Sequence, residues 1–204
     1  MQGPAHQSLL ECRKCRRLAN QLKQLRDHRP DYWNRPVPAS GSSDAAILIV
    51  GLAPGLHGAN RTGVPFAGDA SGNLLHAILT ELDLVEQVVI TNAVKCLPIK
   101  NLPSSREVKN CSKYLVRELN RHALNENPVV FALGGVAHRA IIAAQGLRQA
   151  DYVFTHGAVH RLADMSLVNS YHCSRYNTQT GRLTPAMFTR TLSKAKKLAQ
   201  KLLR

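Results

Sequence analysis

The sequence predicts an α/β protein, a three-layer sandwich in which helices cover both faces of a central, mainly parallel four-stranded sheet. Apolar runs that end in glycine or a turn are typical of buried parallel strands, and they occur at residues 45–55, 86–96 and 127–135. A stretch with the apolar spacing of a helix follows each run. Strands that alternate with helices favour a parallel sheet, whose ligands bind at the carboxyl ends of the strands.

The first half of the chain is expected to begin with a basic helix from Gln7 to Arg26 that carries Cys12 and Cys15. A connection rich in Pro, Ser and Gly then covers residues 29–45, before the first strand. The helix after that strand is expected at residues 74–84, with Ser71 or Asn73 as its N-cap. The second strand follows at residues 86–96.

The second half continues the alternation. A helix is expected at residues 106–125, opened by Ser104 or Ser105, then the third strand and a helix over residues 136–146. Shorter strands are expected within residues 152–157 and 164–174. The last helix begins at Thr184 and Pro185, a favourable cap and first-turn pair. Its apolar face comprises Phe188, Leu192, Ala195, Ala199 and Leu202, with Lys194, Lys196, Lys197 and Lys201 outside.

Length and charge limit the possible functions. A chain of 204 residues with 44% hydrophobic residues predicts one domain, residues 1–204, with a substantial core. Lys and Arg number 27 against 13 Asp and Glu, a net charge of +14 that favours a nucleic-acid partner. The alternative is a basic surface without an assigned partner. We see neither a signal peptide nor a membrane span in the sequence, and we therefore expect a cytoplasmic protein.

Five cysteines in a reducing compartment favour metal or cluster ligation over disulfides. Cys12 and Cys15 form a C-x-x-C pair, while Cys96 follows a strand and Cys111 lies near the start of a helix. Four thiolates satisfy either tetrahedral zinc or an iron–sulfur cluster. The long gap between the pair and Cys96 disfavours a local zinc ribbon. Ordinary buried thiols remain the other reading.

Two motifs give a more specific indication. The loop GLAPGLHGANRTGVPFAGDASG, Gly51 to Gly72, resembles the first motif of the uracil-DNA glycosylase superfamily, and YHCSRYNTQTGRLT, Tyr171 to Thr184, resembles its second. With the four cysteines, they are similar to the fifth family, the iron–sulfur type B enzymes of bacteria and archaea. The first family has aspartate at Ala53 and the fourth has glutamate at Leu52. The fifth family resembles this chain in lacking both acids and in having a carboxylate at Asp69.

The resemblance implies the following roles. Cys12, Cys15, Cys96 and Cys111 would hold a structural 4Fe–4S cluster. Phe66 would stack on an extruded base and Asn92 would read its edge, beside Gly51, Ala53 and His57 of the same pocket. His172 would donate a hydrogen bond to the departing base, and Asp69 would position water or support the cationic sugar. Each of these residues, taken alone, also has a structural alternative. Phe66 could be a core residue, Asn92 could cap a turn and Asp69 could cap a helix.

Other residues of the two motifs are expected to bind the DNA backbone. Glycine and proline let main-chain amides approach phosphates, and the residues after His172 lie where the superfamily inserts a wedge into the duplex. The expected DNA-binding residues are Pro54, Gly55, Asn60, Arg61, Ser174, Arg175, Tyr176 and Asn177. Cys173 occupies a position that is usually proline in the family. A nucleophilic Cys–His pair is disfavoured, because adjacent strand residues point to opposite sides.

The resemblance therefore implies a monofunctional DNA glycosylase that removes uracil and other deaminated bases, hypoxanthine, xanthine or mismatched thymine, in base excision repair. Its partner would be double-stranded DNA, with single-stranded DNA as an alternative, and the protein would be a nucleoid-associated monomer without a membrane partner. Two rivals are a non-catalytic iron–sulfur protein that binds nucleic acid or senses redox state, and a zinc-bound DNA-binding protein.

Overall fold

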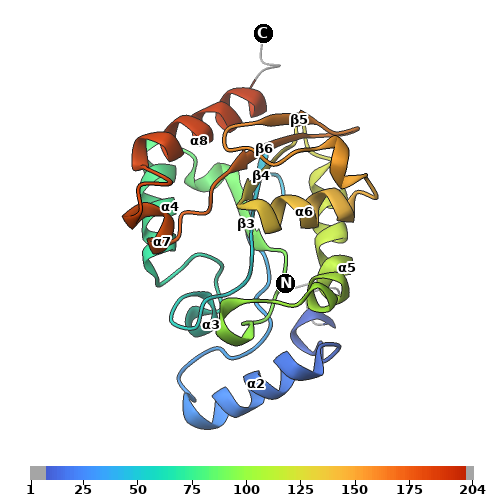
Figure 1. Cartoon of the computed structure of the whole chain (residues 1–204), viewed down its shortest axis with the longest axis vertical. Coiled ribbons are helices and arrows are strands. Elements are labelled where there is room, and N and C mark those ends of the chain that lie inside the picture. The colour runs from blue at the N-terminus through green and yellow to red at the C-terminus, as the bar shows by residue number, and fades with distance from the viewer. Residues whose placement is uncertain (1–7, 201–204) are drawn as a thin grey trace.

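A six-stranded sheet forms the centre of the protein in the computed structural model, which describes residues 8–200 (Figure 1). Four parallel strands, in the order β3-β2-β4-β6, confirm the predicted parallel core. Two short antiparallel strands that the sequence did not indicate, β1 and β5, pair with its outer edges. The strands are β1 (Ser40–Gly41), β2 (Ile47–Gly51), β3 (Val88–Asn92), β4 (Val129–Leu133), β5 (Val159–Arg161) and β6 (Ser166–Ser170).

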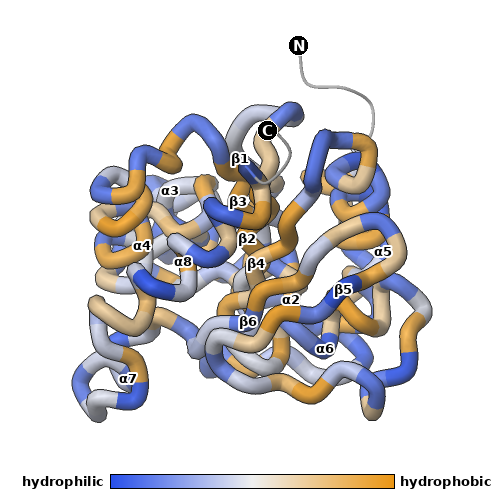
Figure 2. Tube along the Cα trace, turned by 90° about the horizontal axis from the view of Figure 1, so that it is seen from above, coloured by the Kyte–Doolittle hydropathy of each residue, from blue (hydrophilic) through white to orange (hydrophobic). Residues whose placement is uncertain are grey.

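The central strands are apolar on both sides because both faces of the sheet are covered. Along β2, Ile47 and Ile49 join one apolar cluster, whereas Leu48 and Val50 join a second cluster on the opposite face. All four side chains are buried, and each contributes roughly 1.5–3 kcal/mol relative to exposure. Figure 2 shows the same contrast, with apolar residues along the central strands and hydrophilic residues in outlying loops.

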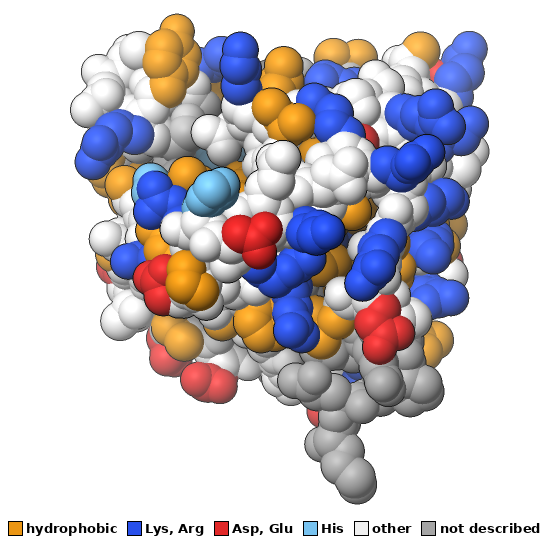
Figure 3. Space-filling model, turned by 90° about the horizontal axis from the view of Figure 1, so that it is seen from below, with side chains coloured by type: hydrophobic (Ala, Val, Ile, Leu, Met, Phe, Trp, Pro, Cys, Tyr) orange, Lys and Arg blue, Asp and Glu red, His pale blue; other side chains and the backbone are white. Residues whose placement is uncertain are grey.

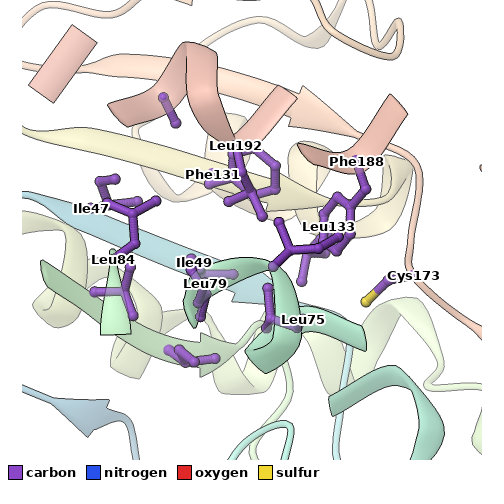
Figure 4. Close-up of a cluster of buried hydrophobic side chains, with 14 of the residues drawn as sticks. Ile47, Ile49, Leu75, Leu79, Leu84, Phe131, Leu133, Cys173, Phe188 and Leu192 are labelled. Atoms are coloured by element: carbon purple, nitrogen blue, oxygen red, sulfur yellow. The ribbon is translucent and has the colours of Figure 1, made fainter. Parts of the chain in front are cut away.

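Four helices provide the two outer layers and confirm the predicted sandwich. On one face lie α4 (Ala70–Glu81) and α8 (Pro185–Ala199), and on the other lie α5 (Ser105–His122) and α6 (Gly135–Ala144) (Figure 1). Thr184 caps α8 as expected, by accepting a hydrogen bond from the Met187 amide. Phe188 and Leu192 of α8 lie in the core with Phe131 of β4 (Figure 4). Leu202 and Lys201 fall outside the described residues.

The basic N-terminal segment differs from its prediction. Its helix, α2 (Arg16–His28), begins after the C-x-x-C pair, so Cys12 and Cys15 lie in the preceding turns and Cys15 is the N-cap. Like charges three or four positions apart disfavour a continuous helix, and Arg13 would repel both Arg16 and Arg17 in one. Residue 7, the predicted start, lies outside the described part.

The expected strand at residues 152–157 is also wrong. A short 3-10 helix, η3 (Gln149–Asp151), is followed by irregular chain, and the strand that pairs with β6 is β5 instead. The turn that makes β5 antiparallel to β6 lies between the two strands, where the Leu162 amide donates to the Met165 carbonyl at 2.9 Å. Most of residues 152–157 therefore precede the hairpin, and only Gly157 bonds to β6, through its amide to the Asn169 carbonyl at 2.7 Å.

The register of the sheet brings the motif loops to one edge. Gly51, the last residue of β2, is directly opposite Asn92, the last residue of β3. The loop after β2 contains α3 (Ala59–Thr62), and the segment after β3 contains η2 (Ile99–Asn101). β6 leads into α7 (Arg175–Gln179), while η1 (Val85–Gln87) precedes β3 at the other edge. Within residues 8–200, no helix has the length and apolar character needed to cross a bilayer.

Candidate active site

A cavity of about 530 Å³ opens where the parallel strands end. The loops after β2, β3 and β6 all line it, so the three segments that the sequence analysis singled out do converge. Its lining includes these expected site residues: Ala53, Pro54, Gly55, His57, Phe66, Asp69, Asn92, His172 and Ser174. It also includes Pro98 and Asn101 from the segment after β3, which the sequence analysis did not select.

Phe66 and Asn92 both line this cavity, and both pack against Gly51. A Cβ on Gly51 would lie 2.5 Å from both the Asn92 Oδ1 and the Phe66 ring, so only glycine leaves room for both. Phe66 itself has a φ of +54°, an uncommon conformation for a bulky residue. Gly72 permits it, because a Cβ there would lie 2.0 Å from the Phe66 carbonyl oxygen. Backbone packing thus fixes the aromatic face.

The Asn92 amide and the His172 ring carry buried polar atoms without protein partners. Among the described residues, the Asn92 Oδ1 and the His172 Nδ1 have no hydrogen-bond partner. An unpaired buried polar atom is costly unless something else satisfies it. Because both residues line the cavity, a ligand with complementary donors and acceptors is the natural partner. The Phe66 and His172 rings are 5.9 Å apart, centroid to centroid.

Burial and a nearby carboxylate act in opposite directions on the His172 imidazole. Burial lowers the pKa of its imidazole below the ordinary value, while the negative charge of Asp69 opposes that shift. Asn177 fixes the backbone, because its side-chain amide donates to the His172 carbonyl at 2.8 Å. Ser174 caps α7 by accepting from the Asn177 amide. Two of the expected DNA-binding residues, Ser174 and Asn177, therefore shape the loop that carries His172.

Asp69 has two separate environments for its two oxygens. Its Oδ1 accepts a hydrogen bond from the Gly72 amide at 2.9 Å, which makes Asp69 the N-cap of α4 in place of Ser71 or Asn73. Its Oδ2 lies over Gly58, where a Cβ would come within 2.1 Å. The second oxygen accepts no hydrogen bond from the described residues. One carboxylate can thus serve as cap and as a reactive group.

The rest of the opening loop divides into buried and exposed residues. Asn60 is fully buried, and its amide donates to the Asn34 Oδ1 at 2.9 Å. The expected contact of Asn60 with phosphate is therefore wrong for this fold, because the side chain does not reach the surface. Arg61 is exposed and donates to the Gly68 carbonyl at 3.1 Å. His57 is exposed at the cavity mouth, and the Tyr32 hydroxyl is hydrogen-bonded to its Nδ1 at 2.9 Å.

Sequence reasoning missed Tyr32 and Asn34. Both belong to the segment DYWNRP, which was interpreted as a connection because of its prolines. Asn34 donates to the carbonyls of Leu25 and Arg29, at 3.2 and 2.7 Å, and so ties the end of α2 to the opening loop. Two aromatic residues and an asparagine between prolines were the available signal, but their partners lie about 25 positions further along the chain.

The face that contains the strand ends carries many basic side chains and few acidic ones, as Figure 3 shows from below. This distribution suits a polyanion such as DNA. On α7, Arg175 is exposed, and so is Tyr176, whose exposed fraction is 71%. α7 stands at the margin of the molecule in Figure 2. Both side chains are therefore accessible to a duplex that lies across the cavity.

The four cysteines singled out from the sequence line one small cavity beside α2 and α5. Cys12 and Cys15 come from the turns before α2, Cys96 from the segment after β3, and Cys111 from α5. None of the four forms a disulfide. Two accept hydrogen bonds, Cys111 from the Lys95 amide at 3.3 Å and Cys15 from the Asn110 side chain at 3.5 Å. Such bonds are typical around cluster sulfurs.

The thiols influence one another electrostatically. Burial raises the pKa of Cys111 to about 11 and raises the pKa of Cys96 further, and the neighbouring cysteines add to both shifts. Among residues 8–200, however, no three His, Cys, Asp or Glu side chains are gathered closely enough to hold a single metal ion. Thiolates of one zinc ion converge on one point, whereas those of a cluster bind separate irons. The observation that relates the four cysteines to one another is the small cavity that they line together.

Cys173 is separate from this group. It is buried in the core cluster near Leu75 and Leu133 (Figure 4), and its Sγ is 3.5 Å from the Ser71 carbonyl oxygen. Burial raises the pKa of its thiol to about 12, so the reactive thiolate is disfavoured. This environment gives no support to a Cys–His nucleophile.

The fold and the cavity agree with a comparison of sequences. The profile of the Uracil DNA glycosylase superfamily matches residues 38–196. The chain therefore belongs to the uracil DNA glycosylase superfamily.

Curated relatives narrow the family. The chain is similar to the type-5 uracil-DNA glycosylase of Thermus thermophilus, with 43% identity over 95% of this chain and 96% of that protein. It is 41% identical to the type-5 uracil-DNA glycosylase of Pyrobaculum aerophilum, over 92% of this chain and 88% of that one. The type-5 uracil-DNA glycosylase of Mycobacterium leprae is 39% identical, over 92% and 91%. Within the superfamily, the chain is thus a member of the type-5 family.

Proposed function

We propose that this protein is a monofunctional DNA glycosylase that hydrolyses the N-glycosidic bond of uracil in DNA and starts base excision repair. Hypoxanthine, xanthine and thymine opposite guanine are proposed as further substrates. The observation that carries the proposal is the single cavity in which Phe66, Asp69, Asn92 and His172 meet. Its size suits one nucleobase with part of its sugar, and family membership supports the reaction class.

The proposed reaction needs the target nucleotide outside the duplex, where its base can be held and read. The Phe66 ring provides a face for stacking, and the Asn92 amide provides both a donor and an acceptor for the base edge. The Asn92 amide has no fixed protein partner at its Oδ1. An amide carries both a donor and an acceptor, so it can pair with the edge of more than one deaminated base.

Bond cleavage leaves negative charge on the base and positive charge on the sugar. The neutral His172 ring donates a hydrogen bond to the departing base, and preorganised donors of this kind contribute about 3–4 kcal/mol in other enzymes. The free Oδ2 of Asp69 faces the cavity and supports the sugar cation or orients water. None of the described lining residues is lysine, which supports simple hydrolysis over a lyase step.

We also propose that Cys12, Cys15, Cys96 and Cys111 hold a 4Fe–4S cluster. When bound, such a cluster would supply cross-links between the segment before α2, the segment after β3, and α5. The thiols have no role in base removal, because the cysteine-lined cavity is separate from the catalytic one. Protein purified without oxygen should absorb broadly near 400 nm, roughly as 4Fe–4S proteins do. Cys96→Ser should lose this band, whereas Cys173→Ser should keep it.

The decisive experiment for the catalytic proposal is an excision panel. Purified protein is incubated with duplexes that each contain one uracil, hypoxanthine, xanthine or mismatched thymine, and abasic sites are then cleaved with alkali. We expect cleavage at uracil and none without alkali. Intact strands with every substrate would contradict the proposal and favour a non-catalytic DNA-binding role. Comparing single-stranded with duplex uracil tests the proposed preference for double-stranded DNA.

A further inference from the structure

The segment Leu97–Ser104, which joins β3 to α5, carries two exposed apolar side chains at the rim of the catalytic cavity. Ile99 is 36% exposed and Leu102 is 72% exposed. Single exposed leucines are common on protein surfaces. The position of Leu102 is unusual, because Pro98 and Asn101 of the same segment line the cavity itself.

Both ends of the segment are fixed. Its tip, residues 99–102, is therefore held in place between them. Leu97 is buried at one end. At the other end Ser104 and Glu107 form a capping box, and Glu107 accepts two hydrogen bonds from Arg17, at 2.9 and 2.6 Å. Between these anchors, Lys100 and Asn101 have φ values of +53° and +58°, which are uncommon for residues other than glycine. A tip that is already ordered loses little conformational entropy when it binds.

The tip lies on the opposite side of the cavity from α7. In the sheet order, β2 and β4 separate β3 from β6, so the ends of β3 and β6 are about 14 Å apart at the usual strand spacing. Tyr176 on α7 is exposed on the β6 side, and Leu102 is exposed on the β3 side. A duplex that lies across the strand ends spans both sides of the cavity and is within reach of both side chains.

The surface beside this segment is basic. A cleft of about 450 Å³ adjoins Ser104 and is lined by Lys14, Arg16 and Arg106, among other residues. Within the described chain, none of these three cations has an acidic partner within 4.0 Å. Unpaired cations next to an exposed apolar side chain match a duplex, which offers phosphates beside stacked bases.

We propose that Leu102 inserts into the duplex next to the extruded nucleotide, on the side opposite Tyr176, while Lys14, Arg16 and Arg106 bind the flanking phosphates. This inference rests on the proposed function, and it adds a second apolar contact that neither motif contains. Insertion unstacks a base step and stabilises the kinked duplex from which the base has left. The contact exists only on double-stranded DNA, since a single strand has no base stack to open.

The test compares Leu102→Ala, Leu102→Met and Leu124→Ala with the unaltered protein. Leu124 is 86% exposed and follows the far end of α5, an 18-residue helix about 27 Å long, so it is a matched control away from the cavity. We expect Leu102→Ala to lower kcat/KM on duplex uracil about tenfold, with little change on single-stranded uracil. Leu102→Met, which keeps the apolar bulk, and Leu124→Ala should match the unaltered protein.

A binding assay separates this proposal from the catalytic one. The probe is a duplex that contains a tetrahydrofuran abasic analogue in one strand. A fluorescent 2-aminopurine lies in the other strand, opposite the base next to the analogue. Binding of the unaltered protein should increase the fluorescence, and Leu102→Ala should weaken binding about tenfold and lose the increase. Unchanged binding and excision by Leu102→Ala would overturn the insertion, as would equal losses on single and double strands. If the unaltered protein releases no base, the binding assay still decides the role of Leu102.

Discussion

Replacing Asp69 by asparagine separates the two tasks of this side chain. Its Oδ1 caps α4 through the Gly72 amide at 2.9 Å, and its Oδ2 faces the cavity near Gly55 and Gly58. An asparagine oxygen can still accept from Gly72, so Asp69→Asn should change the free energy of unfolding by only a few tenths of a kcal/mol. The carboxylate charge is lost, and excision should fall by about 10²–10⁴-fold.

Asp69→Ala is the matched variant, because it removes the cap together with the charge. Loss of an N-cap costs about 1 kcal/mol, which lowers Tm by about 2–4 °C for a chain of this size. We therefore expect both variants to be equally inactive, and only Asp69→Ala to be less stable.

The assay is single-turnover release of uracil from a duplex, measured beside thermal unfolding and duplex binding. Single-turnover conditions report the bond-breaking step without product release. Excision by Asp69→Asn within about threefold of the unaltered protein would refute the catalytic role and leave Asp69 as a helix cap. An equal loss of duplex binding and excision would also count against it, since the carboxylate should act mainly after the base is bound.

Three other predictions concern Gly51, Asn60 and the buried histidines. Gly51→Ala places a Cβ 2.5 Å from the Asn92 amide, so excision should fall at least tenfold while duplex binding persists; an active variant would show that this floor is not needed. Asn60→Ala leaves the Asn34 Oδ1 unpaired in the interior and should cost about 1–3 kcal/mol in urea unfolding, whereas weaker DNA binding at unchanged stability would restore the phosphate role. Burial lowers the pKa of His122 and His172, so the unfolded chain binds more protons below about pH 6.5 and the free energy of unfolding should decrease from about pH 7 to pH 5; a constant or rising value would contradict this.

Much of the fold was accessible from the sequence because its signals are local. Apolar runs followed by glycine predict parallel strands, and the pair Thr184 and Pro185 marks the start of α8. The parallel direction of the core strands then follows, because a helix between two strands returns the chain to the end of the sheet where the first strand began. Short edge strands carry weaker signals, and β1, with only two residues, gave none.

The candidate site was predictable for a related reason. Phe66 and Asp69 lie within one motif, and His172 lies in the other, so each is identified by its neighbours in sequence. Asn60 lies in the same motif and was assigned to DNA binding, yet its side chain points inward to Asn34. A motif gives the type and spacing of its residues, but it does not give the direction of every side chain.

Patterns within short stretches were enough to predict the family, the parallel core and the main residues that line the cavity at the strand ends. The folded structure was needed to see that Tyr32 contacts His57, that Asn34 holds Asn60, and that Asn101, next to the exposed Leu102, lines the cavity. Those relationships join residues from separate elements. They arise when the chain buries its apolar faces and its polar groups must find partners across the interior, and no local pattern specifies which partners those are.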